Sequence, residues 1–217
     1  MSSIVLLSGG LDSATAMGLA ATRGDVLGLN VQYGSVHNER ELWFARMIAR
    51  YYMAELIEVT MPASIFGTES ALMSGDIPEA SYVDGPQPTV VPFRNANLIS
   101  IAVAIAEQRG IPYVYAGMHA SDHSNWAYPD CSPEFLGAMA NAVYVGTMHK
   151  VRLVFPFVWL TKAGVVEEAI QMNVPLDLTY SCYRGGAAHC GKCPTCLERK
   201  QAFKDAGYYD PTEYEEV

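Results

Sequence analysis

A glycine-rich string lies where a short apolar run ends. Residues 8–13 read Ser-Gly-Gly-Leu-Asp-Ser and follow the apolar run Ile4–Leu7 directly. Glycines let the backbone approach a polyanion closely, and the first turn of a helix offers free N–H groups and the positive end of its dipole. Ser8 and Ser13 add hydroxyl donors, and Asp12 is a candidate ligand for a Mg²⁺ ion that bridges phosphates. The string therefore predicts a phosphate-binding loop.

This string differs from the two most familiar phosphate motifs. A Walker A loop needs Gly-x4-Gly-Lys-Ser/Thr, and the dinucleotide fingerprint needs Gly-x-Gly-x-x-Gly. Ser-Gly-Gly alone would also suit an ordinary glycine turn between a strand and a helix. The interpretation as a phosphate loop therefore depends on the complete six-residue string and its position.

Four of the five cysteines are gathered near the end of the chain. They are Cys182, Cys190, Cys193 and Cys196, and they contain two overlapping Cys-x2-Cys pairs. This spacing suits a tetrahedral Zn²⁺ site without an open position, so we expect one structural zinc ion per chain that holds a loop together. A disulfide pair and a redox Cys-x2-Cys that delivers sulfur are the alternatives. His189 could replace a ligand, but we expect it to be solvated.

Composition and charge narrow the class of protein. The chain has 217 residues, of which 50% are hydrophobic, and its net charge is −9. This profile excludes a disordered or coiled-coil chain, and the acidic balance disfavours a nucleic-acid-binding surface. We expect neither a signal peptide nor a membrane anchor, because no apolar run approaches the roughly 20 residues that cross a bilayer. The odd number of cysteines suggests a reducing compartment, and we expect a cytoplasmic protein.

Strand-like and helix-like segments alternate along the chain. We expect strands at residues 4–7, 26–33, 55–60, 113–116 and 151–155. We expect helices at residues 13–22, 39–52, 98–106, 133–143 and 161–172. Alternation of this kind predicts an α/β fold of three layers, with a mostly parallel sheet, helices on both faces and ligands at the carboxyl ends of the strands. Residues 61–91 are expected to form an irregular excursion or lid, and residues 208–217 a loosely held end.

The complete string at residues 8–13 resembles the PP-loop of N-type ATP pyrophosphatases, which cleave ATP between the α- and β-phosphates. The resemblance implies an adenine nucleotide alpha hydrolase-like fold, a single domain over residues 1–217 and a zinc-binding subregion at residues 180–200. It also implies that ATP binds together with Mg²⁺. The residues implied to contact ATP are those of the loop and the first helical turns together with one tyrosine, namely Leu7, Ser8, Gly9, Gly10, Leu11, Asp12, Ser13, Ala14, Thr15 and Tyr33.

Further motifs resemble one family of PP-loop enzymes, the 7-cyano-7-deazaguanine synthases of queuosine and archaeosine biosynthesis. The motifs are Tyr33-Gly34 with His37 and Glu41, Val91-Pro92-Phe93-Arg94-Asn95, Tyr128-Pro129-Asp130-Cys131, Thr161-Lys162 and Ser181-Cys182-Tyr183. Together with the loop and the cysteines they cover residues 8–203, nearly the whole chain. The Tyr-Pro-Asp-Cys string and the cysteine spacing separate this family from other PP-loop enzymes.

This resemblance implies an ATP-dependent ligase. ATP adenylates the carboxylate of 7-carboxy-7-deazaguanine, ammonia displaces AMP to give an amide, and a second adenylation leads to the nitrile with loss of AMP. The implied partners are these small molecules and a second copy of the chain in a homodimer, without nucleic acid or membrane. Asp12, Arg94, Lys162 and Asp130 are the implied catalytic residues. Arg94 and Lys162 are candidates for phosphate or carboxylate contacts, and Asp130 for the N–H groups of the base.

Several positions leave questions open. Phe93 replaces the expected Gly or Asn and could narrow the site, Ser132 replaces a usual Arg, and Gly164 replaces the Glu of a capping box. A non-catalytic nucleotide-binding relative is therefore one alternative, and a PP-loop tRNA thiolase is another. Asp122 or His123 could assist ammonia attack as a general acid or base.

Cys131, outside the cysteine cluster, remains open between two roles. It either packs in the core or contacts the base or an intermediate.

Overall fold

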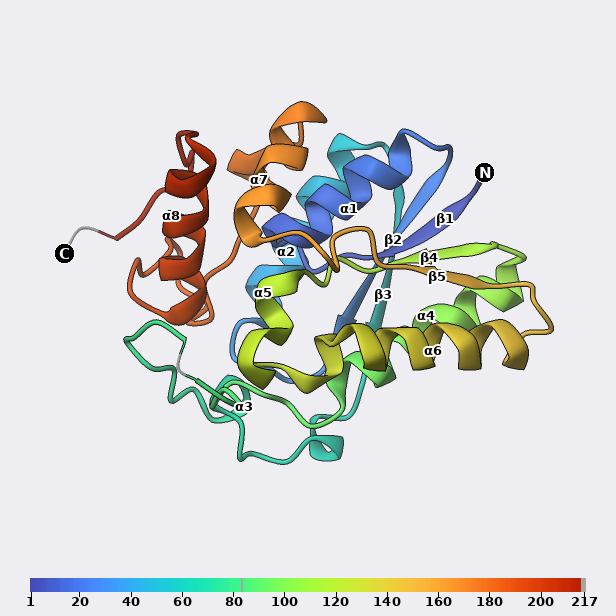
Figure 1. The fold of residues 1–217 in the computed structure, drawn as a ribbon, viewed down its shortest axis with the longest axis horizontal. Coiled ribbons are helices and arrows are strands. Elements are labelled where there is room, and N and C mark those ends of the chain that lie inside the picture. Colours follow the sequence, from blue (N-terminus) through green and yellow to red (C-terminus); the bar gives the residue numbers. More distant parts are fainter. Residues whose placement is uncertain (83, 216–217) are drawn as a thin grey trace.

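A five-stranded, fully parallel sheet forms the centre of the computed structural model, which describes residues 1–82 and 84–215 (Figure 1). Its strands are β1 (Ser3–Leu6), β2 (Val26–Gln32), β3 (Glu55–Thr60), β4 (Tyr113–Tyr115) and β5 (Arg152–Val154). Their order in the sheet is β3-β2-β1-β4-β5. The α/β class and the parallel sheet predicted from the sequence are confirmed.

Helices cover both faces of this sheet (Figure 1). The long helices on one face are α1 (Leu11–Ala21), α2 (Asn38–Tyr51) and α7 (Lys162–Gln171), and α8 (Pro194–Ala206) packs against α7. On the other face lie α4 (Arg94–Arg109) and α6 (Pro133–Gly146). The short elements are α3 (Ala71–Ser74), α5 (Ala120–His123) and the 3-10 turns Ala63–Ile65, Ser124–Trp126, Pro129–Cys131 and Leu176–Leu178.

The central strand β1 explains why both faces must be covered. Successive side chains of a strand point to opposite faces. Ile4 packs with Leu29 among residues of α4 and α6, whereas Val5 packs with Met17 and Ala45 among residues of α1, α2 and α7. Ile4 and Val5 are both fully buried. The apolar run at the N-terminus is therefore typical of a strand that lies in the middle layer of three.

Two helix starts follow the capping pattern seen in the sequence. The hydroxyl of Ser132 accepts a hydrogen bond from the Phe135 N–H at 3.2 Å, and that of Thr161 accepts one from the Gly164 N–H at 3.2 Å. Each hydroxyl satisfies one of the free N–H groups of its helix. Thr161 thus caps α7 without the Glu that a capping box would supply.

The C-terminal part differs from the sequence prediction. No helix was expected after the cysteines, yet α8 begins at Pro194. The expected loose end is also wrong for residues 208–215, because the Tyr214 hydroxyl donates to Asp210 at 2.6 Å and the Glu215 N–H donates to the His189 carbonyl at 2.8 Å. Residues 216 and 217 of that predicted end lie outside the described residues.

Arg199 of α8 anchors this part of the chain. Its side chain is fully buried, and its guanidinium donates to Asp210, Thr179 and the Leu176 carbonyl at 3.1, 2.8 and 3.2 Å. A buried guanidinium is tolerated only when its donors are used in this way. The sequence did not reveal it, since these partners lie 11 to 23 residues away.

The described residues of the excursion at 61–91 are irregular apart from α3 and one 3-10 turn, as predicted, and residue 83 of this segment lies outside the described residues. It is fastened to the cysteine segment by Glu79, which lies 2.8 Å from Arg184 and 2.9 Å from Lys192. Its action as a lid stays a prediction, and so does the single domain over residues 1–217 with its 180–200 subregion. Among the described residues, no helix has both the length and the apolar character that a membrane span requires.

We predict that Arg199→Met lowers the free energy of unfolding by about 3 kcal/mol, because the largely buried Asp210 would lose its counter-charge and the Leu176 carbonyl one of its donors. Urea unfolding followed by circular dichroism measures this loss. Lys204→Met, at an exposed position of the same helix, is the control and should change stability by about 0.5 kcal/mol or less. Equal stability of the two variants would show that Arg199 does not stabilise the fold.

Candidate active site

A cavity opens at the carboxyl ends of β1, β2 and β4. Its wall includes Leu7 after β1, Asn30 of β2, and Ala116 and Gly117 after β4. The chain passes from β1 outward to β3 and then crosses over to β4, so the strand order reverses between β1 and β4. Ligands of open parallel sheets bind at such a reversal.

The predicted phosphate loop forms part of this wall. The Ser13 hydroxyl donates to the Gly10 carbonyl at 3.0 Å, and the Gly10 N–H donates to the Ser8 hydroxyl at 3.3 Å. Gly9 has a φ of 84°, and a Cβ placed on it would lie 2.6 Å from the backbone nitrogen of Ala45 in α2. Only glycine fits there, because the loop turns tightly against α2.

Most of the predicted ATP contacts face the cavity. Those that line it are Leu7, Ser8, Gly10, Leu11, Asp12, Ser13 and Tyr33. Gly9 packs against α2, whereas Ala14 and Thr15 are fully buried inside α1, where the Thr15 hydroxyl donates to the Leu11 carbonyl at 2.7 Å. Contact of all ten residues with ATP stays a prediction, and the position of these last three gives it no support.

A charged centre lies beside the loop. The Lys162 ammonium at the start of α7 donates to Asp12 Oδ2 at 2.6 Å and to His119 Nε2 at 3.0 Å, and Glu198 lies 3.8 Å away. Burial alone would lower the pKa of Lys162, but Asp12, Glu198 and Asp122 outweigh it and raise that pKa. Burial likewise opposes the Asp12 charge, yet Lys162 and His119 lower the Asp12 pKa overall. Lys162 and Asp12 therefore form an ion pair at neutral pH.

His119 contacts this pair, a role that the sequence did not reveal. Its side chain is 1% exposed, and its backbone N–H donates to Asp122 Oδ2 at 3.1 Å. Because the Lys162 ammonium has no acceptor, Nε2 must accept its hydrogen bond, which places the ring proton on Nδ1. The available signal was position, since His119 follows β4 at the same edge of the sheet as the loop.

The two residues proposed as acid or base differ in placement. Asp122 lines the cavity, and its Oδ1 lies 3.4 Å from His119 Nε2. His123 Nε2 instead lies 3.4 Å from the Val158 carbonyl. Asp122 is therefore better placed than His123 to meet a ligand.

Arg94 stands on a different part of the wall, at the start of α4. It donates to the Tyr33 hydroxyl at 3.1 Å, and its guanidinium carbon lies 5.6 Å from the centre of the Tyr33 ring. Burial would lower the Arg94 pKa, but Tyr33, Tyr183 and Asp130 outweigh it, so the pKa is raised. No ion pair within 4.0 Å joins Arg94 to a carboxylate in the part of the chain that the structure describes.

Asp130 is occupied at the same helix start. Its carboxylate accepts from the Asn95 N–H at 2.9 Å, a favourable place for a negative charge, and it is not part of the cavity wall. Its predicted contact with the base stays a prediction. Phe93 is 64% exposed and meets the Phe135 ring edge-on at 5.8 Å, so its ring is not part of the wall that it was expected to narrow.

Cys131 packs in the core and also lines the cavity, while its contact with the base or an intermediate stays a prediction. It is 5% exposed within an apolar cluster, yet it lines the cavity and accepts from the Asn95 side chain at 3.2 Å. Burial raises the pKa of its thiol well above the usual value. It is therefore a neutral thiol at neutral pH.

Three tyrosines complete the wall near Arg94. The Tyr128 and Tyr183 hydroxyls lie 3.4 Å apart, and the Tyr82 ring meets the Tyr128 ring edge-on at 6.0 Å. All three line the cavity. Burial raises the pKa of each phenol, so all three are neutral and can both donate and accept hydrogen bonds.

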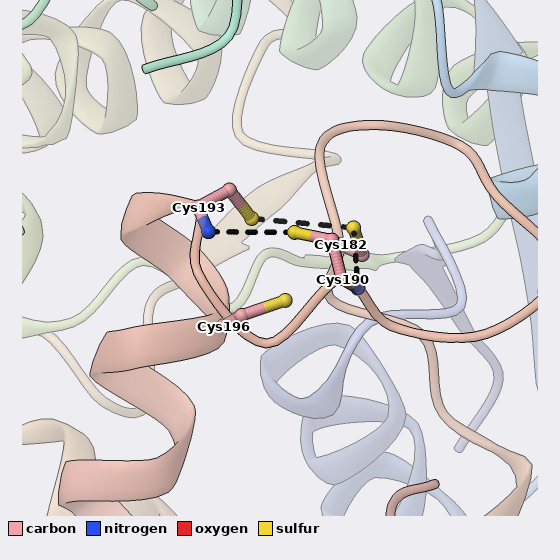
Figure 2. Close-up of side chains that lie close together, drawn as sticks. All are labelled: Cys182, Cys190, Cys193 and Cys196. Carbon is pink, nitrogen blue, oxygen red and sulfur yellow. Dashed lines mark hydrogen bonds between the residues drawn. The ribbon is translucent and has the colours of Figure 1, made fainter. Parts of the chain in front are cut away.

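The four clustered cysteines point toward one another (Figure 2). Their Sγ atoms all lie within 4.8 Å of one another, all four are buried, and none is in a disulfide. Four thiolates cannot share so small a volume without a cation, because their charges repel, whereas an ion bound by thiolates at about 2.3 Å fits between them. The donor set therefore fits a metal ion.

His189 is not solvated as expected. It is 5% exposed, and its Nε2 accepts a hydrogen bond from the Ser181 N–H at 2.9 Å. The group of residues placed to share a metal consists of the four cysteines and does not include His189.

The cysteine cluster also builds one side of the cavity. Five wall residues lie within two positions of a clustered cysteine in the chain, namely Tyr180, Ser181, Tyr183, Thr195 and Glu198. Cys193 and Cys196 stand at the start of α8, the helix that carries Glu198. An ion at the cysteines would thus fix both the loop with Tyr183 and the helix with Glu198.

Comparison with known proteins identifies the family. The model of a family described as Queuosine biosynthesis protein QueC matches residues 2–207. The chain belongs to the QueC family. A 7-cyano-7-deazaguanine synthase of Porphyromonas gingivalis strain ATCC 33277 is 40% identical over 98% of the chain and 97% of the relative. One of Methanospirillum hungatei is 39% identical over 99% of the chain and 100% of the relative.

Solved structures of other proteins share the fold of this QueC family member. The U34-tRNA thiolase NcsA of Methanococcus maripaludis, with its [4Fe-4S] cluster, has a TM-score of 0.52 at 14% identity and covers 99% of this chain and 74% of its own. NMN synthetase of Francisella tularensis has a TM-score of 0.51 at 17% identity, with 99% and 88% covered. At these identities the likeness concerns the fold alone.

We predict that Cys193→Ala removes the metal from this QueC family member and lowers stability, because binding free energy of a structural ion is folding free energy. Metal content per chain by mass spectrometry and the thermal unfolding midpoint are the measurements. Cys131→Ala, which changes a buried cysteine outside the cluster, should keep the metal. Full metal content and an unchanged midpoint in Cys193→Ala would contradict four-cysteine ligation.

Proposed function

We propose that this chain is an ATP-dependent ligase that converts 7-carboxy-7-deazaguanine and ammonia to 7-cyano-7-deazaguanine. The observation that carries the proposal is a single cavity that joins a phosphate loop to a separate cationic and aromatic wall, in a member of the QueC family. A carboxylate needs activation before ammonia can attack it, and the cavity offers separate groups for a triphosphate and for an acid.

The proposed reaction runs in two rounds. A carboxylate oxygen attacks the α-phosphorus of ATP, pyrophosphate leaves, and ammonia adds to the acyl adenylate, which loses AMP and a proton to give the amide. The amide oxygen then attacks a second ATP and releases pyrophosphate. Loss of AMP and the remaining N–H protons leaves the nitrile. The protein contributes orientation and charge stabilisation to each step.

Lys162, Asp12 and the loop amides are placed to handle the phosphates. The free N–H groups at the start of α1 and the Lys162 ammonium offset negative charge. Asp12 also fits a divalent cation, because its Oδ2 is held by Lys162 while its buried Oδ1 has no hydrogen-bond partner in the described part of the chain. Mg²⁺ bound there with ATP would neutralise phosphate charge.

We further propose that the ion at the cysteines is one structural zinc per chain. Four thiolates complete a tetrahedral shell, which leaves no position for water or substrate. The cysteines Cys182, Cys190, Cys193 and Cys196 would then hold Tyr183 and Glu198 in the cavity wall rather than take part in chemistry.

The chain is proposed to act on small molecules in the cytoplasm, as a homodimer and without a nucleic-acid partner. Five unbridged cysteines agree with a reducing compartment, and the net charge of −9 disfavours RNA. Neither alternative, the tRNA thiolase or the non-catalytic nucleotide-binding relative, is favoured by the relatives.

We predict that the protein with ATP, ammonium and 7-carboxy-7-deazaguanine forms the nitrile, with AMP and pyrophosphate as the other products. Mass spectrometry detects the amide and the nitrile, and chromatography separates AMP from ADP. Asp12→Ala should abolish turnover but keep the metal ion at the cysteines, since Asp12 is not one of the ligands of that ion. Formation of ADP, or AMP release that does not depend on the base, would exclude the proposed ligase.

His119→Leu should lower kcat/KM for ATP by about 10- to 100-fold, because the buried Lys162 ammonium loses a hydrogen-bond acceptor worth roughly 1.5–3 kcal/mol. Steady-state kinetics and the unfolding midpoint are measured together. His119→Gln, whose amide oxygen can accept the same hydrogen bond, should recover part of the loss. If the two variants are equally impaired, or if loss of activity follows loss of stability, His119 does not orient Lys162.

A further inference from the structure

The cavity contains two cations whose surroundings differ. Lys162 forms an ion pair with Asp12 at 2.6 Å, so its charge is already balanced beside the phosphate loop. Within residues 1–82 and 84–215, the hydrogen-bond partners of Arg94 are neutral, namely the Tyr33 hydroxyl at 3.1 Å and the Asn95 side-chain oxygen at 3.4 Å. The negative charge of Asp130 attracts the Arg94 guanidinium from nearby, but its carboxylate accepts a hydrogen bond from the Asn95 N–H at the start of α4.

Arg94 is half-buried and has no carboxylate ion-pair partner in the described part of the chain, so its guanidinium can bind an anionic ligand. Arginine presents a planar fork of donors that matches the two oxygens of a carboxylate. In the proposed reaction the phosphates of ATP have their own partners in the loop, Lys162 and Mg²⁺. The anion that remains to be placed is the carboxylate of the acid.

The wall next to Arg94 suits a flat, polar ring. Tyr82, Tyr128 and Tyr183 come from three separate segments of the chain and line one cavity. Their aromatic faces offer stacking, while neutral hydroxyls can donate to ring acceptors and accept from ring N–H groups. The Tyr128 hydroxyl is hydrogen-bonded to the Thr89 hydroxyl at 2.6 Å, so this tyrosine is held in place by the protein itself.

We propose that Arg94 binds the carboxylate of the planar heteroaromatic acid, and that Tyr82, Tyr128 and Tyr183 hold its ring. This assignment rests on the proposed ligase function and divides the cavity. The phosphates lie toward Lys162, and the acid lies toward Arg94.

This division has a consequence for the two rounds of reaction. Ammonia converts the anionic carboxylate to a neutral amide, so the ion pair with Arg94 exists only in the first round. The ring is chemically unchanged, so its contacts with the tyrosines persist in both rounds. Arg94 therefore distinguishes the acid from the amide and the nitrile, whereas the tyrosines do not.

The test compares three ligands on the metal-loaded protein without ATP. Isothermal titration calorimetry measures the dissociation constants of 7-carboxy-7-deazaguanine, its carboxamide and its nitrile. Arg94→Gln should weaken binding of the carboxylate by about 10- to 100-fold, and that of the nitrile by about 3-fold or less. Tyr183→Phe should weaken all three by a similar factor.

Two further variants keep the result interpretable. Arg152→Gln changes an exposed arginine that also packs on a tyrosine ring, Tyr144 at 4.7 Å, and should bind all three ligands like the unmodified protein. Arg94→Lys retains a cation without the planar fork. It should lose less carboxylate affinity than Arg94→Gln, and unfolding midpoints identify any variant that fails to fold.

The outcomes separate the subsite from the function. If Arg94→Gln weakens all three ligands equally, or weakens only a non-hydrolysable ATP analogue, the subsite is overturned even when the unmodified protein still makes the nitrile. If the unmodified protein binds none of the three ligands and makes no nitrile, the proposed function falls together with the subsite. Selective loss of the carboxylate supports the assignment.

Discussion

The hydrogen-bonded ion pair between Lys162 and Asp12 is the interaction on which the site depends. The two residues are 150 positions apart and lie 2.6 Å from each other. Lys162 begins α7 and Asp12 lies in the first turn of α1, so the pair holds two helix starts at the switch between β1 and β4. His119 adds a third element. The pair leaves Asp12 Oδ1 available, and one carboxylate can thus serve lysine and a cation together.

The segments that carry the cysteine cluster form the other side of the cavity. Ligands of a parallel sheet bind outside the carboxyl ends of its strands, and further segments must enclose them there. Here the segment that carries Cys182, together with α8, closes this side of the cavity with Tyr183 and Glu198. A structural ion can therefore control activity without touching a substrate, because it sets the shape of the wall.

The sequence predicted what depends on local patterns. The loop around Asp12, the caps Ser132 and Thr161 and the cysteine spacing are each encoded within a few neighbouring residues, and the alternation of elements predicted the sheet. The sequence could not place His119 and Arg199, because their roles depend on partners brought together by folding. The helix α8 was not predicted, because the cysteine spacing around Pro194 is typical of a metal-binding loop. Proline is nevertheless favourable in the first turn of a helix, as it is here.

The acidic composition and the cationic cavity are compatible because charge is arranged locally. A net charge of −9 spreads over the chain, whereas the cavity concentrates Lys162 and Arg94 where anions must meet. Two anions repel each other in a shared pocket, and each needs its own counter-charge to approach within reacting distance. Pairing with Asp12 moderates the positive charge of Lys162 at the proposed phosphate end of the cavity, whereas Arg94 is proposed to keep its charge for the acid. In the proposed reaction this guanidinium would bind the neutral amide less tightly than the acid, whereas the neutral tyrosines would contact the ring in both rounds.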